Sequence, residues 1–436
     1  MWNREVRARV IAGLAILIFM RCASAFAQEQ TTQQLPIPTG KTQTQSDDKR
    51  WQVTFDSAWS LFSTKETSPT VPGWVKSSLN SMPVGMQFVG IPNDDWKIEA
   101  GIRSGYVDLH QTGSGGGDAR FSGWTDTSLV GTVTYYGFNG FQPFVSLATN
   151  LPTGQSLLTG PIAKAPPVDS DVTQIAGFGE GFNLGPTIGV NIPLMKNLLL
   201  SLSGGYTSRG HFLRTGPDVV VPGPGLGAVQ DFKPGDVATF NASIGYQAGA
   251  WSFQAGGSYS YEAGTMLDGV NFYQTGGKYT LSGAAGYAWT ENWSSKVSAS
   301  YAHIGKNRYP IAPAAGVFDL REEFFNTNSD ATTVVLDTTY NSGTWALGPT
   351  ASYFHRDANG YDSDTDNFLS AKTKWTAGVA GQYAVTKQVS LNARAEHLWM
   401  VVDEIPGPAA PIGNPPAVPK LDTVGWIVTI GGKVVF

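Results

Sequence analysis

The side chains that could do catalytic chemistry are few and scattered in this 436-residue sequence. Three of the five histidines, His303, His355 and His397, share a residue parity with neighbouring Tyr and Trp residues in strand-like segments, and His110 and His211 fall in predicted loops. Acid–base or nucleophilic catalysis needs a histidine within hydrogen-bond reach of its partner, and histidines within an aromatic row do not indicate such a pair. We therefore predict no catalytic residue and a protein that is not an enzyme.

Metal and cofactor motifs are equally weak. The Asp-rich stretch DANGYDSDTD at 357–366 resembles a calcium loop, but it lacks the glycine at position six and the closing glutamate, which leaves weak cation binding as an open alternative. The strings GSGGG and GFGEG lack the strand-to-helix context of a phosphate-binding loop. We predict no metal site and no cofactor.

Charged and hydroxyl side chains recur instead at every second position of segments whose other positions are apolar. Successive side chains of a strand point to opposite faces, so each segment has one wet face and one apolar face. Two interpretations stay open: these residues line an aqueous channel, or they neutralise one another in pairs. Seven cations against five anions are too slight an excess to predict anion selectivity. The candidates are Asp56, Lys97, Glu99, Arg103, Asp126, Lys278, Lys296, Asp337, Lys372, Lys374, Arg394 and Glu396.

The segments that must position these residues read as about sixteen strands, with fourteen as an alternative. They are 51–62, 83–91, 96–106, 125–136, 141–151, 183–192, 197–207, 236–247, 250–261, 276–289, 292–303, 331–341, 344–355, 371–384, 389–400 and 422–436. Many apolar faces begin and end on aromatic residues, as in Trp96 with Tyr106 or Trp345 with Tyr353. A soluble sandwich would show mostly Val, Ile and Leu there, whereas rings flanking an apolar band are typical of a membrane barrel. The predicted lipid-facing residues are Trp96, Ile98, Ile102, Val145, Leu147, Leu336, Val379 and Ile430.

The connections support the same fold class. Seven are short and rich in turn residues (PNDD, GFNG, PLMKN, QAGA, TEN, NSG and VTKQ), and they alternate with eight longer ones. We predict an all-β protein, a transmembrane antiparallel up-and-down β-barrel with short periplasmic turns and long extracellular loops. Its surroundings would be outer-membrane lipid and lipopolysaccharide.

The two ends of the chain indicate how it reaches that membrane. Arginines precede an apolar run at 10–20 and an Ala-Phe-Ala site, which predicts a cleaved signal peptide over 1–27, a polar periplasmic segment over 28–50, and the barrel over 51–436. The mature charge of −8 argues against nucleic acid as a partner. The apolar parity of the last strand ends on Phe436, which is similar to the C-terminal signal read by the barrel-assembly machinery. The predicted localisation is the cell outer membrane.

One region resembles a known family. The segments SMPVGMQFVGIPNDDWKIEAGIRSGYVDL, GWTDTSLVGTVTYYGF and FQPFVSLATNLPTG, within residues 81–155, resemble the outer-membrane family named for the meta-pathway of phenol degradation. That family is distantly similar to the long-chain fatty-acid transporters. The resemblance implies a barrel that carries hydrophobic or aromatic compounds inward. It supplies no catalytic residues.

Four long connections are rich in Pro, Gly and apolar residues. This composition is unusual, because a loop exposed to water gains no stability from apolar side chains. They predict either an apolar vestibule that captures small molecules or loops that pack on one another. The candidate capture residues are Val219, Val220, Val221, Leu226, Ile311, Val317, Ile405 and Val418. We predict a channel for passive uptake of small hydrophobic or aromatic compounds. The alternatives are a general or weakly ion-selective porin and, behind it, a surface enzyme or an adhesion barrel.

Overall fold

The computed structural model describes residues 51–69, 73–114, 118–155, 171, 179–216, 228–310, 319–363, 368–405 and 420–436. The predicted signal peptide and the segment 28–50 lie outside these residues. Across the described chain no helix is both long and apolar enough to cross a membrane. The structure there is built from strands.

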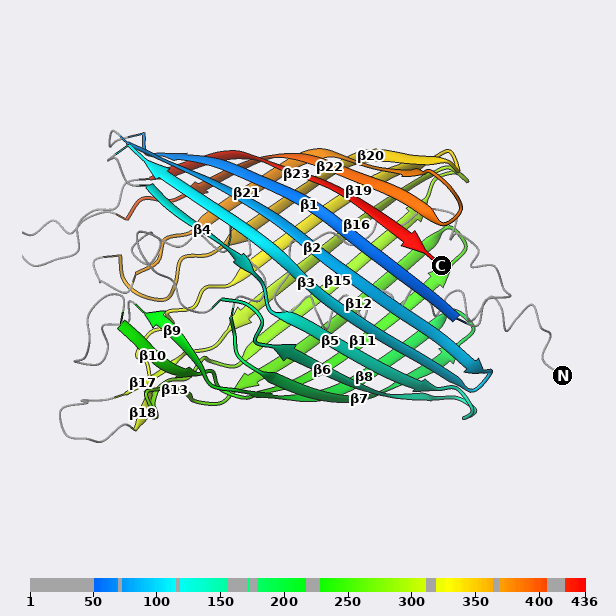
Figure 1. Cartoon of the computed structure of the whole chain (residues 1–436), viewed down its shortest axis with the longest axis horizontal. Coiled ribbons are helices and arrows are strands. Elements are labelled where there is room, and N and C mark those ends of the chain that lie inside the picture. Colours follow the sequence, from blue (N-terminus) through cyan, green and yellow to red (C-terminus); the bar gives the residue numbers. More distant parts are fainter. Residues whose placement is uncertain are drawn as a thin grey trace, which may run out of the picture.

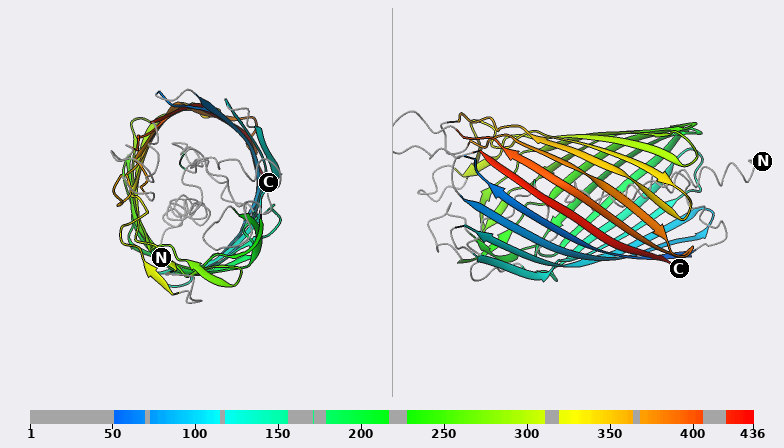
Figure 2. Two further views of the ribbon diagram at one scale, coloured as in Figure 1. Left: turned by 90° about the vertical axis from the view of Figure 1, so that its left-hand side faces the viewer. Right: turned by 90° about the horizontal axis from the view of Figure 1, so that it is seen from above.

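The barrel wall is one antiparallel sheet that closes on itself (Figures 1 and 2). It has sixteen wall-crossing strands, here called staves, as the sequence predicted, and β4 and β5 together count as one stave. Thr125 and Asp126 lie between β4 and β5 in the chain, and each of these two strands pairs with β3. The ring closes where Thr54–Thr67 of β1 pairs with Asp422–Val435 of β23. The staves are β1 (Trp51–Thr67), β2 (Trp74–Asn93), β3 (Trp96–Gly113), β4 (Asp118–Trp124) with β5 (Thr127–Tyr135), β6 (Gln142–Leu151), β7 (Asn183–Met195), β8 (Leu198–Arg209), β11 (Val237–Ala248), β12 (Trp251–Glu262), β15 (Lys278–Ala288), β16 (Trp293–Ile304), β19 (Ala331–Asn341), β20 (Trp345–Arg356), β21 (Lys372–Ala384), β22 (Val389–Val402) and β23 (Leu421–Val435).

The seven predicted tight turns are all present and lie at one end of the barrel, the end at which β23 finishes (Figure 1). Gly249 and Gly343 occupy two of these turns with φ of 57° and 90°. Residues with a side chain rarely adopt this left-handed conformation, which accounts for glycine at both positions.

The first long connection predicted, between 62 and 83, is wrong. Strand β1 continues to Thr67, and strand β2 already begins at Trp74. Strand β3 continues to Gly113, so that His110 lies in a strand and not in a loop. The outward residues of these extensions include Lys65 of β1, Lys76 of β2 and His110 of β3, which are polar and exposed. The apolar alternation therefore stops there, although backbone pairing continues beyond the level of the lipid.

The outward face carries an apolar band between two aromatic rows. Seven of the eight predicted lipid-facing residues are 40–57% exposed, and Ile98 is half-buried. At the turn end, Trp96 packs on Tyr135 and Trp251 on Tyr287, with ring centroids 4.7 and 4.4 Å apart. At the other end, Tyr353 lies 4.3 Å from Trp375. Such rows flank the apolar zone of outer-membrane barrels.

Two small sheets stand at the end opposite the tight turns (Figure 1). One joins β9 (Phe212–Gly216), β10 (Ala228–Lys233), β13 (Thr265–Leu267) and β14 (Val270–Tyr273), and the other pairs β17 (Arg308–Pro310) with β18 (Leu320–Glu322). Parts of the long connections are thus sheet structure.

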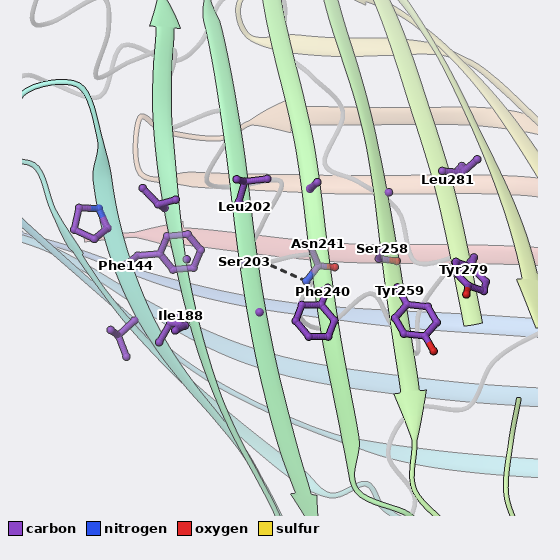
Figure 3. Close-up of a pocket in the computed structure, with 17 residues that line it drawn as sticks. Phe144, Ile188, Leu202, Ser203, Phe240, Asn241, Ser258, Tyr259, Tyr279 and Leu281 are labelled. Atoms are coloured by element: carbon purple, nitrogen blue, oxygen red, sulfur yellow. Dashed lines mark hydrogen bonds between the residues drawn. The ribbon is translucent and has the colours of Figure 1, made fainter. Parts of the chain in front are cut away.

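A depression of about 940 Å³ lies on the wall formed by β6, β7, β8, β11, β12 and β15 (Figure 3). Its exposed apolar side chains include Ile188, Leu202, Phe240 and Leu281, which share the outward parity of Trp251. The depression faces the lipid, so the candidate functional site is to be sought in the lumen.

The outward band generates a stability prediction. Ile430→Arg, at a 52% exposed position between Trp426 and Phe436, should destabilise the folded barrel by about 2–4 kcal/mol, because a cation is placed near the bilayer midplane. Ser298→Arg, on the inward parity, is the control and should be close to neutral. Urea unfolding in lipid vesicles measures both, and equal losses would contradict the assignment of the two faces.

Phe436 generates a second prediction. Its side chain is 65% exposed, and its N–H donates to the carbonyl of Val53 at 2.9 Å. We propose that the ring is read during assembly, so deletion of Phe436 should lower the amount of heat-modifiable protein in the outer membrane. Phe436→Tyr, which keeps an aromatic ring, should restore that amount. Unchanged levels in the deletion would remove this role.

Candidate functional site in the barrel lumen

Hydroxyl and amide side chains cover much of the inner wall. They pair across neighbouring strands, as in Ser60 with Thr429 at 3.0 Å, Ser352 with Thr376 at 2.7 Å, and Ser201 donating to Asn191 at 2.5 Å. A buried polar group without a hydrogen-bond partner destabilises the fold. These pairs give the inward polar groups such partners.

Several of the inward charges form ion pairs. Lys97 lies 2.9 Å from Glu99, and Arg394 Nη2 lies 2.6 Å from Glu396. Arg394 on β22 also donates to Thr350 on β20 at 2.9 Å and lies 3.9 Å from Asp337 on β19. Contacts that pass over intervening strands occur on the concave side of a barrel, which places these residues in the lumen.

The remaining wall candidates follow the same parity. Asp56 is in register with Lys433, and Lys296 is in register with Asp337. Lys278 and Arg103 are half-buried on the inward side of β15 and β3. Of the two interpretations of these residues, mutual neutralisation describes several of them, and a channel-lining role stays a prediction.

Three inward cations converge on one residue from a distant part of the chain. Asp171 lies in the chain between β6 and β7, and these two strands stand far from β20 and β21 around the ring (Figure 2). Its Oδ2 lies 2.6 Å from Arg356 Nη1 and 3.3 Å from Lys372 Nζ, and Lys374 Nζ donates to its backbone carbonyl at 2.5 Å. We call Arg356, Lys372 and Lys374 the basic trio.

Asp126, one of the predicted lining residues, binds the two ends of the connection between β6 and β7. It is 5% exposed and lies in the break between β4 and β5. Its carboxylate accepts from the N–H of Gly154 at 2.7 Å, the N–H of Glu180 at 2.7 Å and the side-chain amide of Asn150 at 2.8 Å. The carboxylate therefore ties together the two ends of the chain segment that carries Asp171.

The inner wall also carries an apolar patch that the sequence analysis missed. It extends over β22, β23, β1, β2, β3 and β4, and most of its side chains are at most 8% exposed. It lies at and beyond the level of the outer aromatic row, where Tyr106 and Trp399 mark the outward side of β3 and β22. The members of this inner apolar patch are Phe62, Leu79, Val107, Leu109, Phe121, Leu398 and Met400, with Val402 and Ile427 packed against them.

The basic trio and the inner apolar patch are neighbours. Lys374 is in register with Met400, and Lys372 with Val402, across the β21–β22 pair. Lys374 Nζ also lies 5.3 Å from the ring centroid of inward-facing Phe354. Cations and apolar side chains thus meet on one part of the wall.

The histidines occupy the positions expected from their parity. His303 bonds Asp330 at 2.7 Å, His355 stacks beside Tyr353, and His397 packs between Trp399 and Trp426 in the outer aromatic row. Among the described residues, no group of three or more His, Cys, Asp or Glu side chains could hold a metal ion.

The predicted loop capture surface remains untested. Ile405 is half-buried, and the other seven residues proposed for it, Val219, Val220, Val221, Leu226, Ile311, Val317 and Val418, lie outside the described residues.

A closed barrel with an apolar outer band, two aromatic rows and a polar, charged interior defines a protein of the outer-membrane channel class. No protein-family model matches the chain, and no curated protein sequence matches it. Similar solved structures include a FadL homologue from Pseudomonas aeruginosa, with 9% identity, 88% of this chain and 90% of that chain covered, and a TM-score of 0.40. The CymD monoaromatic hydrocarbon channel has 11% identity, 88% of each chain covered and a TM-score of 0.34. OccAB4 from Acinetobacter baumannii has 8% identity, 89% and 99% covered and a TM-score of 0.41.

With TM-scores below 0.5, these likenesses assign neither a family nor a substrate. The resemblance to the phenol meta-pathway family stays a prediction.

Asp126 generates a prediction about the segment it ties. Asp126→Ala removes the acceptor of two backbone N–H groups and one amide, each such hydrogen bond to a charged group being worth about 1.5–3 kcal/mol. Proteinase K should then cut the folded barrel between Leu151 and Asn183 about tenfold faster or more. Asp118→Ala, which removes an exposed carboxylate bonded to His110, is the control. Equal cleavage rates would contradict the role of Asp126.

Proposed function

We propose that the protein is an outer-membrane channel for passive uptake of small hydrophobic or aromatic compounds. The observation that supports the proposal is the inner apolar patch. Phe62, Leu79, Leu398 and Met400 lie on the lumenal side of the wall near the extracellular end, where they belong to one apolar cluster and are at most 4% exposed. A pore that serves only water, ions and sugars gains nothing from such a surface, because the interior of a porin is polar.

The patch supplies a driving force that polar solutes cannot use. An apolar compound gains roughly 25 cal/mol for each Å² of surface it buries, so ~100 Å² of contact corresponds to about 2.5 kcal/mol. Because the seven core side chains of the patch are at most 8% exposed, an apolar compound gains this free energy only when it inserts among them at the mouth of the barrel, before it crosses the polar section below. Binding then precedes diffusion, and uptake saturates.

A general or weakly ion-selective porin is the second candidate. The hydroxyl pairs and ion pairs of the inner wall favour it, because they keep that wall hydrated. The two candidates differ in the solutes they rank first. A porin passes small sugars readily and shows no saturable uptake of an apolar probe.

The test replaces part of the patch with polar residues of similar size. The double variant Leu398→Gln with Met400→Gln should lower saturable uptake of the neutral probe N-phenyl-1-naphthylamine into outer-membrane vesicles by about tenfold or more. Single-channel ion conductance should stay equal, because no charge is added. Val385→Gln, at a half-exposed position in a periplasmic turn, is the matched control.

Heat-modifiable gel mobility shows whether each variant has folded. Phe62→Tyr, which adds one hydroxyl to a ring that stays in place, is a milder variant and should lower uptake in the same direction. Ready swelling of liposomes in small sugars, with no saturable probe uptake by the unaltered protein, would replace this proposal with the porin.

A further inference from the structure

We propose that the basic trio is a carboxylate-binding site, and that the preferred substrates are therefore anions that join a carboxylate to an apolar ring or chain. The inference deepens the proposed function and rests on it. Its basis is the juxtaposition of Arg356, Lys372 and Lys374 with the inner apolar patch.

Asp171 shows that the trio can hold a carboxylate. The Oδ2 atom of Asp171 lies 2.6 Å from Arg356 and 3.3 Å from Lys372, within ion-pair distance of both. The Nζ of Lys374 donates to the backbone carbonyl of Asp171. The cations come from two adjacent strands, β20 and β21, whose pairing fixes their spacing, since Arg356 is in register with Lys372. This register fixes the spacing of the backbone positions that carry Arg356 and Lys372.

Exchange of Asp171 for a substrate carboxylate is electrostatically inexpensive. Lys374 is 4% exposed, and the side chains of Lys372 and Arg356 are 14% and 21% exposed. Loss of this carboxylate would leave these partly buried cations with less compensating charge, which is unfavourable. A substrate carboxylate that replaces the Asp171 carboxylate keeps these cations paired, so Asp171 acts as an internal competitor for the site.

The apolar half of the site follows from register. Met400 and Val402 on β22 are the cross-strand partners of Lys374 and Lys372, and the ring of Phe354 lies beside Lys374. A ligand whose carboxylate contacts the trio has its ring or chain next to these side chains. Chloride and acetate can use only the cations, and a neutral aromatic compound can use only the apolar side chains.

The experiment compares benzoate with benzamide, which has the same ring and no charge. The half-saturation concentration for uptake of each radiolabelled compound is measured in proteoliposomes that carry the full mature chain, after subtraction of protein-free vesicles. Arg356→Gln should raise the value for benzoate about tenfold and change that for benzamide less than twofold. Lys387→Gln, which removes a cation from a periplasmic turn, is the matched control and should change neither.

Asp171→Asn is the second variant, and it predicts a gain. The amide keeps the shape of the side chain but removes the competing charge, so the half-saturation concentration for benzoate should fall several-fold. This variant tests the inference even where Arg356→Gln does not fold. A value that stays the same or rises would overturn the role of Asp171 as a competitor.

The outcomes separate this inference from the proposed function. Saturable uptake of benzamide that equals that of benzoate in every variant would reject the carboxylate site and leave the hydrophobic channel standing. Uptake of acetate with the same half-saturation concentration as benzoate would reject the apolar half of the site. Saturable uptake of none of these compounds would reject the proposed function itself.

Discussion

Backbone hydrogen bonding inside a lipid bilayer is the constraint on which the rest of this structure depends. No water is present there to satisfy an unpaired N–H or C=O, so a sheet can cross only if it has no edge. Pairing of β1 with β23 removes the edge. Closure then divides every strand into a lipid face and a lumen face, and it leaves charged residues a place on the lumen side only.

The lumen face meets a second constraint, because charges on it are partly withdrawn from water. Ion pairs such as Lys97 with Glu99 and Arg394 with Glu396 meet it locally, within one strand. The basic trio meets it with Asp171, a residue brought from far along the chain and around the ring. The same solution places a carboxylate where a substrate carboxylate could stand. The Asp126 carboxylate makes this arrangement possible, because it fixes both ends of the segment that bears Asp171.

The sequence predicted all sixteen staves, because period-two alternation is imposed by lipid on one side and water on the other. The sequence-based prediction failed where a strand does not stand between lipid and water. The extensions of β1, β2 and β3 stand beyond the lipid and present polar residues outward, so their alternation ends early. Arg356 was missed because it follows the last residue of its predicted strand by one position. The contact of Asp171 leaves no periodic signal at all, since the fold brings the residue to its partners across the lumen.

The inner apolar patch was partly visible. In the run HLWM at 397–400 both parities are apolar or aromatic, which a water-facing parity does not explain. Leu398 and Met400 point inward there, while His397 and Trp399 join the outer row. A strand segment that is apolar on both faces near an aromatic row therefore indicates a lumenal contact surface.

The seam of the barrel has a consequence for the route a solute can take. The β1–β23 pairing extends without a break from Thr54 to Thr67, whereas β5 pairs with β6 only over Thr127–Thr134. Unzipping the seam would break a longer ladder of backbone hydrogen bonds than separating those two internal strands. The first and last strands are therefore a poor place for a side exit into the membrane.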